Sequence, residues 1–255
     1  MSVVIAAYQA AATVGASIDS LLAQDGVDVE ILVGDDASDD GTAEVLAARF
    51  GDEPRVRRFT SRRNQGAYNL RNALAAHARG TYLTFHDADD LAVPGRLLAQ
   101  VDALVATGAR ASYGCMFRIT ADGRAVFFRD GAALRLAMVT LLTTPEEFRS
   151  LGGFRPARFG ADLELHETLR HRHGDRAIEI VRQPLMLGLW AAGSATRQRD
   201  AEALEDGYRA PARRRYVELL ARRWLDGDPP AWSERLDRAL RADGNYQEPS
   251  TIDPA

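Results

Sequence analysis

Short apolar runs alternate with helical patterns through the first half of the chain. In the helical segments, apolar residues recur every three to four positions, so that one helix face can be buried. The predicted strands are residues 3–8, 29–33, 56–60 and 81–86, and the predicted helices are residues 14–24, 42–50, 67–79 and 94–107. This alternation is typical of a sheet with helices packed on its faces. We therefore expect an α/β fold of the Rossmann type with a mixed, mostly parallel sheet.

The second half of the chain follows a different pattern. Apolar runs at 111–119 and 125–129 flank the pair Asp122-Gly123, which is a strong signal for a hairpin. The other predicted elements are helices at 145–151 and 162–173, a strand or strand pair at 178–190, and amphipathic helices at 201–225 and 232–241. The remaining residues, 243–255, are polar and proline-rich, and we expect a flexible tail there.

Composition narrows the chemistry that the chain can perform. The chain has 255 residues, 46% hydrophobic and 27% charged, so it can bury a sizeable core without disulfide or metal staples. Its net charge of −4 gives no reason to expect nucleic-acid binding. All 32 basic residues are arginine. The absence of lysine excludes Schiff-base enzymes, Walker-A phosphate loops, protein kinases and receiver-type phospho-acceptor domains, each of which needs a specific lysine.

The sequence also bears on cellular location. No run of about 18 apolar residues could span a bilayer, and the first residues lack a basic leader. Cys115 is the only cysteine, so no intramolecular disulfide can form, and a reducing compartment fits. We expect a cytoplasmic protein without an integral membrane segment.

Acidic residues follow two of the predicted strands directly. They are Asp35 and Asp36 after the second strand, and Asp87, Asp89 and Asp90 after the fourth. Ligands of open parallel sheets bind beyond the carboxyl ends of the strands, so these carboxylates can converge on one ligand. Two carboxylates one residue apart can hold Mg²⁺ or Mn²⁺ and leave positions for phosphate oxygens. An isolated D-x-D string is more often a solvated turn, but its place between a buried strand and a helix favours the metal hypothesis.

A third acidic segment lies at residues 159–167. Asp162 and Glu164 open a predicted helix, where a capping residue and a first-turn acid are ordinary. Either carboxylate could instead accept a proton during catalysis. His166 and His171 are five residues apart rather than four, so they do not share one helix face and do not indicate a zinc site.

Four motifs, taken in order, resemble glycosyltransferase family 2. Residues 3–8 and then 33–42, which read V-G-D-D-A-S-D-D-G-T, are similar to the family's opening, where a strand ends in D-D-G-S-x-D-G-T. The N-Q-G at 64–66 with R-N at 71–72, the G-T-Y-L-T-F at 80–85 with the acidic cluster, and the L-G-G-F at 151–154 with G-A-D at 160–162 follow in the family's order. The resemblance covers roughly residues 1–200.

The resemblance implies a GT-A fold and an inverting, metal-dependent enzyme of the hexosyltransferase type, which moves a sugar from a nucleotide-diphosphate donor to an acceptor hydroxyl. Residues 1–107 would form the nucleotide-binding half, 108–200 the acceptor-side half, and 201–242 a short helical extension. The resemblance implies that Ala7 and Tyr8 line the nucleobase pocket, that Asp36 hydrogen-bonds the nucleobase, and that Arg71 lies near the diphosphate or the nucleobase. It further implies that Asp87 reaches the ribose or the metal, that Asp89 binds the Mg²⁺ or Mn²⁺ ion, and that Asp162 is the general base.

Three positions depart from the family's pattern. Gln9 stands for the usual Asn, Ala37 for a Gly, and Ala161 for the acid that usually precedes the base. The last departure keeps Glu164 open as an alternative base, although the offset from the preceding glycine favours Asp162.

Two further residues are donor-side candidates. His86 could touch the donor or could simply be packed, and Arg197 belongs to a segment, 193–199, that could be a lid or a plain connector.

The donor and the reaction class leave alternatives. A UDP-sugar is the expected donor because the family uses it most often, the acceptor is unknown, and a homodimer stays open. A non-catalytic nucleotide-sugar-binding protein is the first alternative function. A sugar nucleotidyltransferase is the second, although the segment 10–15 lacks the Gly-rich, basic loop that such an enzyme needs.

Overall fold

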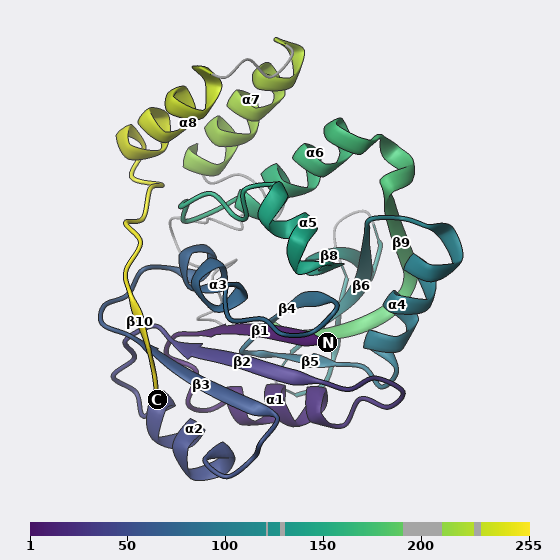
Figure 1. Cartoon of the computed structure of the whole chain (residues 1–255), viewed down its shortest axis with the longest axis vertical. Coiled ribbons are helices and arrows are strands. Elements are labelled where there is room, and N and C mark those ends of the chain that lie inside the picture. Colours follow the sequence, from purple (N-terminus) through teal and green to yellow (C-terminus); the bar gives the residue numbers. More distant parts are fainter. Residues whose placement is uncertain (121, 128–130, 191–210, 227–230) are drawn as a thin grey trace.

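Within the described residues, ten strands form one sheet, with helices on both of its faces (Figure 1). The structure is a computed structural model and describes residues 1–120, 122–127, 131–190, 211–226 and 231–255. The strand order is β10-β3-β2-β1-β4-β8-β6-β9-β5, with β7 paired to β6 alone. This architecture confirms the predicted α/β class with a mixed sheet.

The first half of the chain builds four parallel strands in the order β3-β2-β1-β4. The strands are β1 (Ser2–Ala7), β2 (Glu30–Asp35), β3 (Val56–Ser61) and β4 (Leu83–Asp87), and the helices between them are α1 (Val14–Leu22), α2 (Thr42–Phe50) and α3 (Ala67–Ala75). Each predicted strand and helix of this half is present. The third helix ends at Ala75, a few residues before the predicted end.

The second half completes the sheet with mainly antiparallel pairs. Its elements are β5 (Asp90–Ala92), α4 (Arg96–Thr107), β6 (Ala111–Ile119), β7 (Ala125–Val126), β8 (Leu134–Thr143), α5 (Pro145–Ser150), α6 (Ala161–His173), the 3-10 turn η1 (Asp175–Ala177), β9 (Ile178–Leu189), α7 (Pro211–Leu225), α8 (Ala231–Ala242) and β10 (Ile252–Pro254). Strand β8 pairs with β4 and β6, while β9 runs parallel to β6 and antiparallel to β5. The sequence analysis did not foresee β5 or β8.

Two apolar cores lie on opposite faces of the sheet. Neighbouring residues of β1 and β2 alternate between them, as the two-residue period of a strand requires. Val4 and Leu32 pack with α3, α5 and α6, whereas Ile5 and Val33 pack with α1 and α2. The acidic residues therefore follow strands whose other positions are buried on both faces.

The two C-terminal helices share the first of these cores. Leu220 of α7 and Leu236 of α8 are buried with residues of α3, α5 and α6. The part of the predicted helix before residue 211 lies outside the described residues. No helix among the described residues is both long and apolar enough to cross a membrane.

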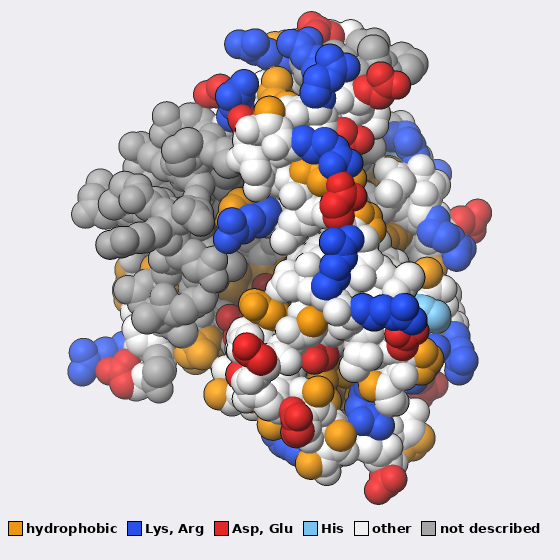
Figure 2. Space-filling model, turned by 90° about the vertical axis from the view of Figure 1, so that its left-hand side faces the viewer, with side chains coloured by type: hydrophobic (Ala, Val, Ile, Leu, Met, Phe, Trp, Pro, Cys, Tyr) orange, Lys and Arg blue, Asp and Glu red, His pale blue; other side chains and the backbone are white. Residues whose placement is uncertain are grey.

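The expectation of a flexible tail at 243–255 is wrong. Strand β10 pairs antiparallel with β3, with Ile252 opposite Ser61, and Asp253 forms an ion pair with Arg62 at 3.1 Å. The edge of β3 offers unpaired backbone groups, and the tail satisfies them. Figure 2 looks onto this side of the molecule and shows acidic and basic side chains alternating down the middle of the face, rather than a patch of one sign.

Replacing Leu236 by alanine should test whether the C-terminal helices are part of the main core. The side chain is 0% exposed, so its truncation should lower the free energy of unfolding by about 2–5 kcal/mol. Urea denaturation should show one cooperative transition at a lower midpoint. The control is Val105→Ala, at a side chain that is 72% exposed, which should change stability by less than about 0.5 kcal/mol. A separate early transition in Leu236→Ala would contradict a shared core.

Candidate functional site

The carboxyl ends of β2, β1 and β4 lie side by side and bring the first two acidic segments together. Ala7 is opposite Asp35, and Ala6 is opposite Asp87. The backbone N–H of Asp36 donates a hydrogen bond to the carbonyl of Ala7 at 2.8 Å, which ties the two strand ends together. The loop after β1 therefore runs between the two sets of carboxylates.

Three carboxylates after β4 form the most acidic cluster of the described residues. Oxygen atoms of Asp87, Asp89 and Asp90 lie within 4.8 Å of one another. Burial, and then the Asp87 carboxylate, raise the pKa of Asp89 to about 6. Burial, followed by Asp87 and Asp89, also raises the pKa of Asp90 well above its usual value. The cluster includes Asp90, which the sequence analysis placed in the acidic segment without a role of its own.

Such a donor set fits a hard divalent cation. Carboxylate oxygens are the ligands that Mg²⁺ and Mn²⁺ prefer. A cation would offset both the burial and the mutual repulsion that raise these pKa values. Arg71 of α3 forms an ion pair with Asp87, and its side chain is 9% exposed. The Arg71 Nε atom is buried and has no hydrogen-bond partner among the described residues. The Arg71 guanidinium thus places a positive charge beside the Asp87 carboxylate, and this charge fits an anionic ligand next to the cation.

Asp36 holds the loop that precedes α3. Its two carboxylate oxygens accept hydrogen bonds from the backbone N–H groups of Gln65 and Gly66, at 3.0 and 2.8 Å. Burial raises the pKa of Asp36. Each carboxylate oxygen can accept a further hydrogen bond. Tyr8 is 52% exposed, whereas the side chain of Ala7 is buried in the core and can shape a pocket only through its backbone.

Two residues around this edge have left-handed backbone conformations. Gln9 has φ 52° and Ala37 has φ 60°. The two loops are joined by a hydrogen bond from the Gln9 N–H to Ser38 Oγ at 3.0 Å. Asn and Gly adopt positive φ more easily than Gln and Ala do. At both positions, the left-handed backbone conformation explains why the family usually has Asn or Gly there.

Asp162 reaches the site from the N-terminus of α6. It accepts a hydrogen bond from the Tyr68 hydroxyl at 2.9 Å. The ring of Tyr68 lies 5.7 Å from the guanidinium carbon of Arg71, which is the partner of Asp87. Tyr68 and Arg71 are three residues apart on α3 and so share one face. This helix connects Asp162 to the acidic cluster, and Tyr68 was missed in the sequence because no local pattern marks it.

Glu164 serves a different purpose from Asp162. Its carboxylate is 7% exposed, and it pairs with Arg155 at 2.9 Å and with Arg223 of α7 at 2.6 Å. It also accepts a hydrogen bond from the Tyr216 hydroxyl. With these three partners, Glu164 joins α6 to α7 and has little capacity left to act as a base.

His86 lies beneath the acidic cluster and is fully buried. Its Nδ1 faces Arg96 Nη1 at 2.6 Å, and its Nε2 faces the carbonyl of Asp90 at 3.1 Å. Because a guanidinium can only donate, Nδ1 is the acceptor and Nε2 carries the proton. Burial, and then Arg96, lower the pKa of His86 well below its usual value. Both ring nitrogens are therefore occupied. The last candidate, Arg197, lies outside the described residues.

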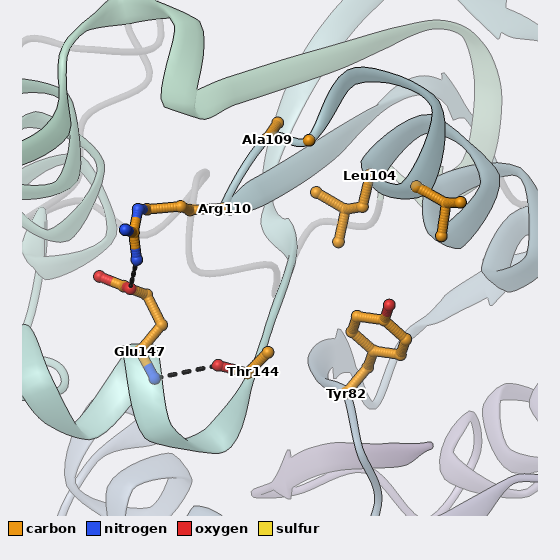
Figure 3. A pocket seen from close by; sticks show the side chains of 8 residues that line it. Tyr82, Leu104, Ala109, Arg110, Thr144 and Glu147 are labelled. Atoms are coloured by element: carbon orange, nitrogen blue, oxygen red, sulfur yellow. Dashed lines mark hydrogen bonds and ion pairs between the residues drawn. The ribbon is translucent and has the colours of Figure 1, made fainter.

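A pocket of about 380 Å³ lies away from this edge (Figure 3). Tyr82 and Thr144, which line it, stand at the opposite end of β4 from Asp87. Its charged side chains, Arg110 and Glu147, pair with each other at 2.9 Å. None of the predicted site residues lines it, so we place the candidate site at the acidic edge.

Comparisons with known proteins identify the family of the chain. A family model described as glycosyl transferase family 2 matches residues 2–175. The chain is 38% identical over 139 residues to the succinoglycan biosynthesis protein ExoO of Rhizobium meliloti (strain 1021), covering 54% of this chain and 39% of ExoO. It is 32% identical over 114 residues to the Escherichia coli UDP-Glc:alpha-D-GlcNAc-diphosphoundecaprenol beta-1,3-glucosyltransferase WfgD, covering 45% and 44% of the two chains. Each match spans less than half of the relative.

Solved structures show the same fold. TarS of S. aureus in complex with UDP-GlcNAc superposes with a TM-score of 0.64 at 18% identity, covering 95% of this chain and 70% of that chain. The mannosyltransferase PcManGT from Pyrobaculum calidifontis, in complex with GDP-Man and Mn²⁺, gives a TM-score of 0.60 at 17% identity, covering 95% and 72%. The fold is that of the GT-A glycosyltransferases.

Replacing Ala37 by glycine should stabilise the protein. The left-handed conformation costs a residue with a side chain about 1–2 kcal/mol, partly offset by the larger entropy of glycine in the unfolded chain. We expect a gain of about 0.5–1 kcal/mol in the free energy of unfolding, measured by urea denaturation. The matched control is Ala48→Gly in the exposed face of α2, which should lose about 0.5–1 kcal/mol. Equal losses in both variants would contradict the strain at Ala37.

Proposed function

Because the chain belongs to glycosyltransferase family 2, we propose that it is an inverting, metal-dependent glycosyltransferase that moves a sugar from a nucleotide-diphosphate donor to an acceptor hydroxyl. A UDP-sugar is the proposed donor, and Mg²⁺ or Mn²⁺ the proposed cofactor. The observation that carries the proposal is the connection of Asp162, through Tyr68 and Arg71 of α3, to the carboxylates after β4.

The nucleoside would bind where β1 and β2 end. Tyr8 has an exposed aromatic ring on which a nucleobase can stack, and the Asp36 carboxylate can accept a hydrogen bond from a nucleobase N–H. The solved relatives with UDP-GlcNAc or GDP-Man support a nucleotide sugar as the donor class, without fixing its base.

The diphosphate would lie at the acidic cluster. Asp89, with Asp87 beside it, would hold the cation, and the PcManGT complex with Mn²⁺ supports such a site. A bound divalent cation would neutralise the charge that develops on the diphosphate as it leaves. Arg71, which is paired with Asp87, would add a fixed positive charge beside the diphosphate.

Asp162 would act as the general base. Its carboxylate takes the proton of the acceptor hydroxyl while the hydroxyl oxygen forms a bond to the anomeric carbon and the bond to the phosphate oxygen breaks. The electron pair of the broken bond leaves with the nucleoside diphosphate. Attack opposite the leaving group inverts the anomeric carbon. Tyr68 orients the base through its hydrogen bond, and Glu164 is unsuited to this role because two arginines hold it.

Thermal melting with nucleotides should identify the donor base. We expect one of UDP, GDP, dTDP and CMP, with UDP favoured, to raise the melting temperature in Mn²⁺, because ligand binding to the folded state stabilises it by mass action. Asp89→Ala should abolish the Mn²⁺-dependent part of this shift. Asp102→Ala, at an exposed position of α4, is the control and should keep it.

The same shift should depend on pH. The pKa of Asp89 is raised to about 6, so protons occupy this ligand as the pH falls below about 6, and the Mn²⁺-dependent shift should shrink there. A nucleotide shift that is indifferent to Mn²⁺ and to Asp89→Ala would contradict the assigned metal site.

Replacing Asp162 by asparagine should separate catalysis from binding. Loss of a general base should reduce turnover by about 10²–10⁴-fold, measured as nucleoside diphosphate released from the donor with an acceptor or with water. Mn²⁺-dependent nucleotide binding should persist. The control is Asp175→Asn in η1, which follows α6, where the side chain is 83% exposed. Wild-type turnover in Asp162→Asn would exclude this base, and a wild-type protein that binds nucleotide without turnover would be a binding protein.

A further inference from the structure

Arg118 of β6 is a cation two strands away from Asp90 of the acidic cluster, because β9 lies between β6 and β5. Gly188 of β9 stands between them in register, opposite Arg118 on one side and opposite Asp90 on the other. A Cβ atom built on Gly188 would lie 3.4 Å from Asp90 Oδ1 and 3.6 Å from Arg118 Cγ. Both side chains therefore lie on the same face of the sheet, beside the gap that the glycine leaves open.

The charge of Arg118 acts on the cluster. Its positive charge is the largest cationic influence that favours the ionised forms of Asp89 and Asp90. The guanidinium carbon lies 5.2 Å from the ring of Trp190, which gives the side chain an aromatic surface to rest on. The backbone N–H of Trp190 donates to the carbonyl of Ile119 at 2.7 Å, which holds the backbone of Trp190 beside the end of β6.

Arg118 differs from the other arginines around the cluster because, among the described residues, its one contact is the ring of Trp190. Arg71 is paired with Asp87, and Arg96 is fully buried among His86, Gln100 and backbone groups. Within the part of the chain that the structure describes, the Arg118 guanidinium has no hydrogen bond or ion pair. Its donors are therefore available to a ligand that lies over the carboxylates.

We infer that Arg118 binds the diphosphate of the donor and stabilises the nucleoside diphosphate as it leaves. The inference rests on the proposed function. As the bond from the anomeric carbon to the phosphate oxygen breaks, the electron pair stays on that oxygen, and its negative charge grows. A planar guanidinium with several N–H donors can share this charge between two phosphate oxygens. The chain has no lysine that could stabilise this negative charge instead.

Diphosphate and monophosphate nucleotides should separate this role from a structural one. In Arg118→Met, affinity for UDP in Mn²⁺, or for the diphosphate that the melting panel selects, should fall about ten- to hundredfold, because a charge-assisted hydrogen bond is lost. Affinity for the matching monophosphate should change little. Arg118→Lys keeps the charge without the planar fork and should fall between wild type and Arg118→Met. Isothermal titration measures all of these affinities.

The matched control is Arg182→Met, an exposed arginine of β9 six residues before Gly188, which should bind both nucleotides as wild type does. Equal weakening of diphosphate and monophosphate in Arg118→Met, or no weakening of either, would overturn the inference while leaving the proposed function in place. If the wild-type protein binds no nucleoside diphosphate in Mn²⁺, the proposed function fails and takes this inference with it. If Arg118→Met does not fold, Arg118→Gln takes its place in the same comparison.

Discussion

The repulsion among the carboxylates at the end of β4 is the interaction that the surrounding residues must offset. Two unit charges 4.8 Å apart repel each other by roughly 3–4 kcal/mol at the effective dielectric of a protein surface. Three carboxylates at this separation can stay together only if protons or cations reduce that repulsion. The fold supplies positive charge from Arg71 of α3, Arg96 of α4 and Arg118 of β6. Burial and the neighbouring carboxylates still raise the pKa values of Asp89 and Asp90. A cation and an anionic ligand would complete this balance.

The sequence predicted the features that depend on residues close together in the chain. The four parallel strands and their helices follow from local periodicity, and the acidic edge follows from where those strands end. Strand β8 could not be predicted in this way, because its place between β4 and β6 is set by pairing between distant segments. The same holds for Tyr68 and Arg118, because their neighbours Asp162 and Gly188 are remote in sequence. The tail was misjudged because its polar composition does not reveal the open edge of β3.

Departures from the family's pattern are explained by packing and backbone conformation. Ala37 and Gln9 occupy left-handed positions that cost energy without changing a charge or a hydrogen-bonding group of the acidic edge. Ala161 is fully buried in the core that contains Leu165 and Tyr216. A carboxylate there would lose its hydration among apolar neighbours, which is costly without a partner. Alanine at this position is consistent with the close packing of α7 against the start of α6.

Helix α3 connects Asp162 to the carboxylates at the end of β4. Tyr68 and Arg71 are one turn apart, so a single rigid element sets the position of Asp162 relative to Asp87. The loop before this helix is held by Asp36, and Asn69 on the same helix donates to the carbonyl of Gln247 in the C-terminal segment. Helix α3 is thus held at its start by Asp36 and in its first turn by the segment that contains Gln247. A shift of one residue within α3 would rotate the following positions by about 100°, so Tyr68 and Arg71 could not both keep their partners.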